Sequence, residues 1–138
     1  MTPELLTELR NASISFIPSQ QPTLLVTATS GYIPIGQFKE IFSIAETFVK
    51  ERGIQKVIFD KRKLTVFHQP SMVWYFVNWK EKMFDLGLKR HVKLLPDDEV
   101  FRESVKIGRS KINEDFPNGL FHRMEILYAE SLEQALAL

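Results

Sequence analysis

One stretch of the chain, residues 57–76, holds most of the side chains that could do chemistry. It reads VIFDKRKLTVFHQPSMVWYF: an apolar run ends at Asp60, three cations follow, and His68 and Ser71 precede a dense aromatic group. An acid at the carboxyl end of a strand is a candidate binding residue, because ligands of open α/β sheets gather at that edge. Asp60 can equally accept hydrogen bonds from the next turn or pair with a neighbouring cation. The three cations are Lys61, Arg62 and Lys63.

Catalytic chemistry in this stretch is less well supported. Asp60, His68 and Ser71 have the residue types of a hydrolase triad, but triads are recognised by geometry rather than by proximity in sequence. No G-x-S-x-G motif surrounds Ser71. We therefore predict no catalytic residue and keep a hydrolase that uses the Asp60 loop as the least favoured alternative.

The sequence also predicts no metal and no cofactor. The three histidines are far apart along the chain, and there is no P-loop or G-x-G-x-x-G motif. The consecutive acids at 97–99 would not converge on one ion if they lie in a helix, and negative charge is favourable at a helix N-terminus.

Composition narrows the class of protein. With 138 residues, 44% of them hydrophobic and 25% charged, we expect one globular domain over 1–138, with residues 1–12 as a flexible or helical extension. The absence of cysteine excludes disulfides and thiolate metal sites. A net charge of +1 argues against nucleic-acid binding. No apolar run reaches the roughly 18 residues of a membrane span and the N-terminus does not resemble a signal peptide, so a cytoplasmic location is expected.

Hydrophobic periodicity predicts strands alternating with helices. The predicted strands are 13–18, 23–33, 54–60, 90–95 and 121–129. The predicted helices are 36–53, 70–87, 97–112 and 131–138. This order predicts an α/β fold in which one mixed, mostly parallel sheet carries an N-terminal antiparallel hairpin and interleaved helices.

The predicted helix 70–87 is unusually rich in apolar and aromatic residues. Five residues at helical spacing can face the sheet, which leaves Trp74 pointing sideways or outward. An exposed aromatic patch is typical of an interface, so this helix could mediate self-association as a homodimer or bind a protein partner. The alternative is that a neighbouring helix covers it. The five are Met72, Tyr75, Phe76, Trp79 and Met83.

Three segments resemble the STAS/SpoIIAA-like family of small bacterial proteins: KVIFDKRKLTV, GLKRHVKLLPDDEVFR and the closing ILYAESLEQALAL. The resemblance covers roughly residues 20–138 and implies the fold predicted above. Anti-sigma-factor antagonists of that fold carry a phosphorylated serine at the start of the helix. Gln69 and Pro70 stand where the paired serines would be, and Ser71 is one residue late. The resemblance therefore implies a partner-facing loop without carrying over the serine switch.

Together these features predict a non-enzymatic protein-interaction or regulatory module. The partner is expected at the loop 60–71 and the aromatic helix 71–87. The alternative is a carrier of a small apolar, lipid-like ligand, because the SEC14-type fold is related in layout. The candidate binding residues are Asp60, Lys61, Arg62, Lys63, His68, Ser71, Trp74 and Trp79.

Overall fold

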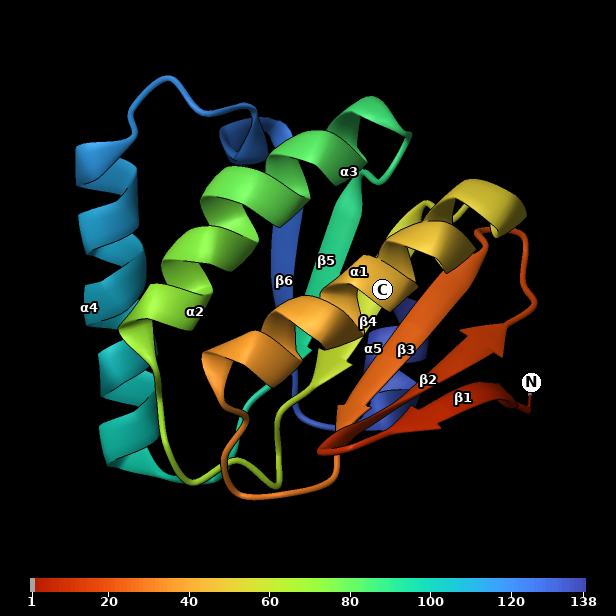
Figure 1. Cartoon of the computed structure of the whole chain (residues 1–138), viewed down its shortest axis with the longest axis horizontal. Coiled ribbons are helices and arrows are strands. Elements are labelled where there is room, and N and C mark those ends of the chain that lie inside the picture. Colours follow the sequence, from red (N-terminus) through yellow and green to blue (C-terminus); the bar gives the residue numbers. More distant parts are fainter. Residues whose placement is uncertain (1) are drawn as a thin grey trace.

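The computed structural model describes residues 2–138, which form an α/β fold around one six-stranded mixed sheet (Figure 1). The strands lie in the sheet in the same order as in the chain. The first three are antiparallel, and the pairs from β3 to β6 are parallel. The predicted α/β class, with a mixed sheet and an antiparallel N-terminal part, is thereby confirmed. The strands are β1 (Glu4–Leu9), β2 (Ala12–Ile17), β3 (Thr23–Ala28), β4 (Lys56–Asp60), β5 (Arg90–Leu94) and β6 (Glu125–Ala129).

The N-terminus differs from the prediction. A flexible or helical extension over 1–12 is wrong for residues 4–9, which form strand β1; Met1 lies outside the described residues. Asn11 has a φ of 76°, a left-handed conformation that Asn tolerates, and it turns the chain so that Leu9 pairs with Ala12. Leu6 and Leu9 then pack against the core. The strand is held by its pairing with β2 and by the packing of these two leucines, which the pattern of residues 1–12 alone does not indicate.

Four helical segments connect the parallel strands, and all four lie on the same face of the sheet. Because consecutive parallel strands are neighbours and such crossovers are right-handed, each connecting helix must lie on the same side. Val57 and Phe59 point into the core beneath these helices, whereas Ile58 points to the opposite face. The helices are α1 (Ile35–Arg52), α2 (Gln69–Trp74), α3 (Glu81–Asp85) and α4 (Glu99–Asp115).

The opposite face is covered by the C-terminal helix α5 (Leu132–Ala137), seen behind the strands in Figure 1. Ser131 accepts a hydrogen bond from the Gln134 amide and caps this helix, as the spacing predicts. Lys56 runs beneath the helix and donates its ammonium to the carbonyls of Ala135 (2.8 Å) and Leu136 (3.2 Å). The helix dipole favours a cation at this end.

The predicted aromatic helix 70–87 is confirmed as helical, with one irregularity. Between α2 and α3 the backbone forms a π-helical segment, η1 (Tyr75–Lys80), and the chain leaves the helix near Gly87, which has a φ of 108°. A π-helical turn widens the helix and is frequent at functional sites. In this protein the π-helical segment contains Trp79 and Lys80, and both side chains are buried.

The last strand is shorter than predicted. Residues 120–123, assigned to a strand from 121, form a 3₁₀ turn, η2 (Leu120–Arg123), and β6 begins at Glu125. Phe121 explains the difference, because it is buried against Phe76 with ring centroids 5.6 Å apart instead of continuing the alternation of a strand.

Helix α4 packs closely on the chain around the start of α2. A Cβ on Gly108 would overlap the Gln69 amide and lie 2.7 Å from Phe67 Cζ, and Phe67 packs edge-on against Phe101 at 6.1 Å between centroids.

We expect Gly108→Ala to lower the free energy of unfolding by about 1–3 kcal/mol, because the Phe67 ring and the Gln69 amide must both move. Gly36→Ala is the control, since its Cβ would meet nothing within 4 Å and Ala is a better helix former. Urea denaturation of the two variants measures the difference; equal midpoints would contradict the close packing.

Candidate functional site

The loop after β4 forms a rim at the carboxyl end of the parallel strands, and its acid is already paired. Arg62 donates Nε to Asp60 Oδ1 at 3.0 Å and Nη2 to Oδ2 at 2.8 Å, and its backbone amide adds a third bond of 3.1 Å. This pairing raises the pKa of the Arg62 guanidinium. Of the two roles that the sequence left open for Asp60, the structure shows the turn-stabilising one.

The three cations of the loop have different environments. Arg62 is paired, Lys63 is exposed, and Lys61 is buried with its Nζ 3.7 Å from Met72 Sδ and 4.9 Å from the centroid of the Phe59 ring. Burial lowers the pKa of Lys61 to about 7. Because Lys61 points inward, only Lys63 and the partly neutralised Arg62 can meet a partner electrostatically.

His68 and Ser71 lie together at the start of α2. His68 precedes the helix, and its Nδ1 is 2.9 Å from Ser71 Oγ. Ser71 is buried, and the two residues border a mostly apolar cavity of about 30 Å³, close to the volume of one water molecule. Asp60 is bonded to Arg62, so only His68 and Ser71 of the three triad-type residues are joined by a hydrogen bond.

The two tryptophans also differ. Trp79 is buried, and its Nε1 donates to the Phe42 carbonyl at 2.7 Å. Trp74 is half-buried and lies edge-on to Phe38 of α1 at 6.1 Å, with Lys39 Nζ 5.9 Å from its ring centroid. Helix α1 therefore covers much of this aromatic surface, as the alternative interpretation proposed, and Trp74 keeps a partly exposed edge.

Sequence reasoning missed two apolar side chains exposed on the rim, Tyr32 and Val66. These residues are 43% and 46% exposed, and the centroid of the Tyr32 ring lies 6.2 Å from that of the His68 ring. The Gly31 carbonyl holds the two loops together by accepting bonds from the amides of Thr65 (2.8 Å) and Val66 (3.3 Å). Residues from two distant parts of the chain thereby form one surface, and the pairing of their loops has no local signal.

A second unexpected feature is a group of buried cations between β5 and the aromatic helix. Lys80 and Lys93 are fully buried, and among the described residues neither ammonium has a hydrogen-bond partner. Their Nζ atoms lie 3.6 Å and 4.8 Å from the centroid of Phe76. Burial lowers the pKa of both well below the usual lysine value, and the nearby cation Lys61 lowers each further.

His91 lies in the same layer, where its Nε2 is 3.1 Å from the hydroxyl of Tyr75. Burial lowers the pKa of His91 well below its ordinary value, and Lys80 and Lys93 add to this effect. The charged form is therefore disfavoured, and the imidazole is held neutral against the tyrosine.

Over residues 2–138, no three His, Asp or Glu side chains gather closely enough to hold a metal ion. No helix within those residues combines the length and the apolar character that crossing a membrane requires.

In comparison with known proteins, the chain matches no family model and no curated protein sequence. The resemblance to STAS/SpoIIAA-like proteins stays a prediction.

The buried lysines make stability depend on pH. Because folding lowers their pKa values, the unfolded chain binds more protons at pH 7, and the free energy of unfolding should rise from about pH 7 toward 9.5, below the ordinary lysine pKa. We expect Lys93→Met to be at least about 1 kcal/mol more stable than the native chain at pH 7, with a shallower rise.

Lys63→Met, which removes an exposed lysine, is the control and should leave the rise unchanged. Urea denaturation at the two pH values measures both effects. The same pH dependence in Lys93→Met as in the native chain would contradict a buried, unpaired ammonium.

Proposed function

We propose that this chain is a non-enzymatic binding module that docks a protein partner on the rim formed by residues 29–34 and 61–68. The observation that carries the proposal is the joining of the two loops at Gly31, which presents Tyr32 and Val66 side by side with the basic turn. A surface that is rigid before binding loses less entropy when a partner docks.

The chemistry of the rim fits an apolar patch beside weakly basic charge. Tyrosine and arginine are enriched among residues that dominate protein interfaces, and Tyr32 and Arg62 are both accessible here. Because Asp60 offsets the charge of Arg62, Lys63 leaves the rim weakly positive. The proposed partner therefore offers an apolar contact bordered by acidic side chains.

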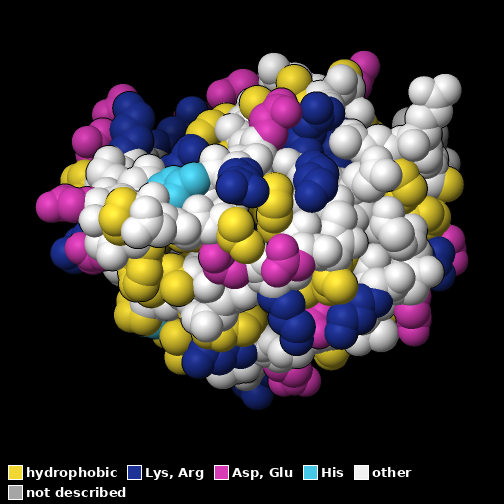
Figure 2. All heavy atoms as spheres, turned by 90° about the horizontal axis from the view of Figure 1, so that it is seen from above, with side chains coloured by type: hydrophobic (Ala, Val, Ile, Leu, Met, Phe, Trp, Pro, Cys, Tyr) yellow, Lys and Arg dark blue, Asp and Glu magenta, His cyan; other side chains and the backbone are white. Residues whose placement is uncertain are grey.

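The opposite end of the molecule, seen from above in Figure 2, has a different character. Lys and Arg side chains are interspersed there with Asp and Glu and with apolar side chains. Mixed charge of this kind is typical of a solvated surface, which favours the rim as the docking end.

The finer fold assignment, STAS/SpoIIAA-like, is part of this proposal. It is supported by the mixed sheet with an antiparallel N-terminal part and by the β4–α2 loop at the carboxyl end of the central strand. We do not propose lipid carriage. The apolar cavity at the rim has a volume of only about 30 Å³, and the larger groove beside α4, of about 650 Å³, is lined by three cations.

The proposal predicts that Val66→Asp disrupts partner binding, because it places a negative charge in the apolar part of a surface that faces an acidic partner. We expect at least a tenfold loss of affinity for the partner that co-purifies from native cells. Val100→Asp is the control, since Val100 is 76% exposed but lies on α4. Quantitative affinity purification of the three proteins measures the loss.

A partner retained by the native chain and by Val100→Asp, and lost by Val66→Asp, supports the rim. Equal retention by all three proteins, or the absence of any specific partner, would contradict the proposal.

A further inference from the structure

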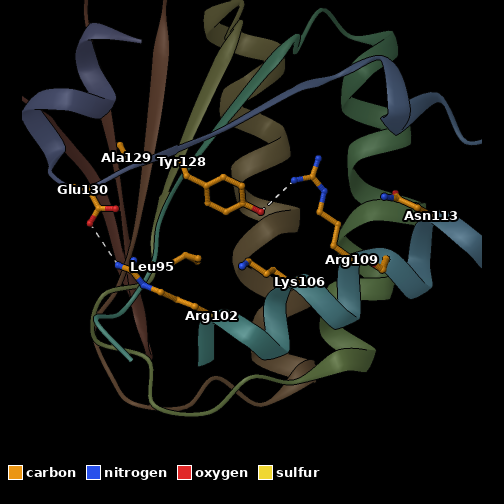
Figure 3. Close-up of a pocket in the computed structure, with 9 residues that line it drawn as sticks. Leu95, Arg102, Lys106, Arg109, Asn113, Tyr128, Ala129 and Glu130 are labelled. Atoms are coloured by element: carbon orange, nitrogen blue, oxygen red, sulfur yellow. Dashed lines mark hydrogen bonds and ion pairs between the residues drawn. The ribbon is translucent and has the colours of Figure 1, made fainter. Parts of the chain in front are cut away.

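Helix α4 lines the groove that separates it from the edge strand with polar side chains only. The buried face of α4 is directed toward α2 and its preceding loop, where Gln69 donates to the Gly108 carbonyl at 3.2 Å. Between α4 and β6 lies a groove of about 650 Å³ (Figure 3). This volume is within the roughly 300–1,000 Å³ of small-molecule sites.

The wall of the groove on α4 is a polar, mainly cationic stripe. Its members are spaced by four, three and four residues, which places them on one face of the helix. A crossover helix ordinarily turns apolar side chains toward its sheet, so a cationic stripe at these positions is unexpected for packing alone. The four residues are Arg102, Lys106, Arg109 and Asn113.

The cations of this stripe are incompletely neutralised by the protein. Arg102 pairs with Glu130 at 3.5 Å, and Arg109 donates to the hydroxyl of Tyr128 at 3.2 Å (Figure 3). Lys106 is exposed and makes no ion pair with any of residues 2–138. With one carboxylate against three cations, the groove has an excess of two positive charges.

The buried lysines lie behind the floor of the groove. Lys93 is paired in register with Tyr128 on the neighbouring strand, so the two side chains share a face of the sheet about 4.8 Å apart along the hydrogen-bonding direction. Lys93 and Lys80 are buried and have no carboxylate partner within the described chain.

The groove also lies where ligands of α/β sheets are usually found. Leu95 and Glu130, which line it, directly follow the carboxyl ends of β5 and β6. The ring of Tyr128 and the side chain of Leu95 add apolar surface to the sheet side.

We propose that the groove between α4 and β6 binds a small organic dianion, best matched by a phosphate monoester. Arg109 and Lys106 contact the phosphate oxygens, Arg102 contributes at the end shared with Glu130, and the organic part lies against Tyr128 and Leu95. A guanidinium presents paired donors that suit phosphate geometry, and a dianion matches the excess charge. This site is separate from the proposed docking rim and does not depend on it.

The test uses phenyl phosphate as the probe, with inorganic phosphate and uncharged phenol as comparisons, at constant ionic strength. We expect saturable binding of phenyl phosphate by the native chain with a Kd of about 1 mM or lower, tighter than that of inorganic phosphate, and no binding of phenol. Isothermal titration calorimetry measures the affinities, and chemical-shift changes confined to α4 and β6 locate the site.

Variants separate the groove from general positive charge. Lys106→Gln and Arg109→Gln should each weaken phenyl phosphate binding at least about fivefold. Glu130→Gln should tighten it, because it removes the one carboxylate that lines the groove among residues 2–138. Lys111→Gln is the matched control on α4, since Lys111 pairs with Asp115 at 3.4 Å outside this groove, and should change the Kd less than about twofold.

Lys106 is exposed, so its variant is expected to fold even if Arg109→Gln does not. No saturable binding up to about 10 mM, or equal weakening by Lys106→Gln and Lys111→Gln, would overturn the proposal. Because partner capture at the rim is measured with different variants, the two proposals can fail independently.

Discussion

The arrangement of this molecule depends on one topological constraint: strands that follow one another in the chain are neighbours in the sheet, and the parallel ones are joined by right-handed crossovers. This places α1, the α2–α3 helix and α4 in a row on one face and leaves α5 to cover the other. Helix α4 is last in the row, with α2 on one side and only the edge strand β6 beneath it. Its position at the end of the row leaves the groove between α4 and β6 open.

The inner layer of the same face shows how cations are accommodated without carboxylates. Phe59, Tyr75 and Phe76 are fully buried, and their rings lie within 5 Å of the Nζ atoms of the buried lysines. Aromatic faces attract cations, and the observed distances from Lys80 to Phe76 (3.6 Å) and to Tyr75 (4.9 Å) allow this interaction. It offsets only part of the cost of removing an ammonium from water. The low pKa values follow from this imbalance, because the neutral amine is the cheaper form to bury.

The candidate sites illustrate which parts of a surface can be recognised from the sequence alone. The sequence identifies Asp60 as the end of a buried strand. It does not identify which of the three cations that follow pairs with Asp60, because the local pattern does not distinguish them. Its bidentate pairing with Arg62 and the burial of Lys61 depend on the path of the loop. Tyr32 and the groove residue Tyr128 belong to segments that looked like ordinary strand ends, and they become part of sites only where distant segments meet them.

What the sequence by itself determined is the alternation of elements. The apolar repeat of α1, the unbroken apolar run of β4 and the Ser131 cap are local patterns, and the structure contains each of them close to the predicted limits. Only the tertiary structure decided the strand at 4–9, the π-helical turn and the direction of each lysine. Lys63, Lys80 and Lys93 are chemically identical, and lysine is ordinarily exposed. Their different burial arises from which segments the fold brings over them, and that depends on contacts between residues far apart in the chain.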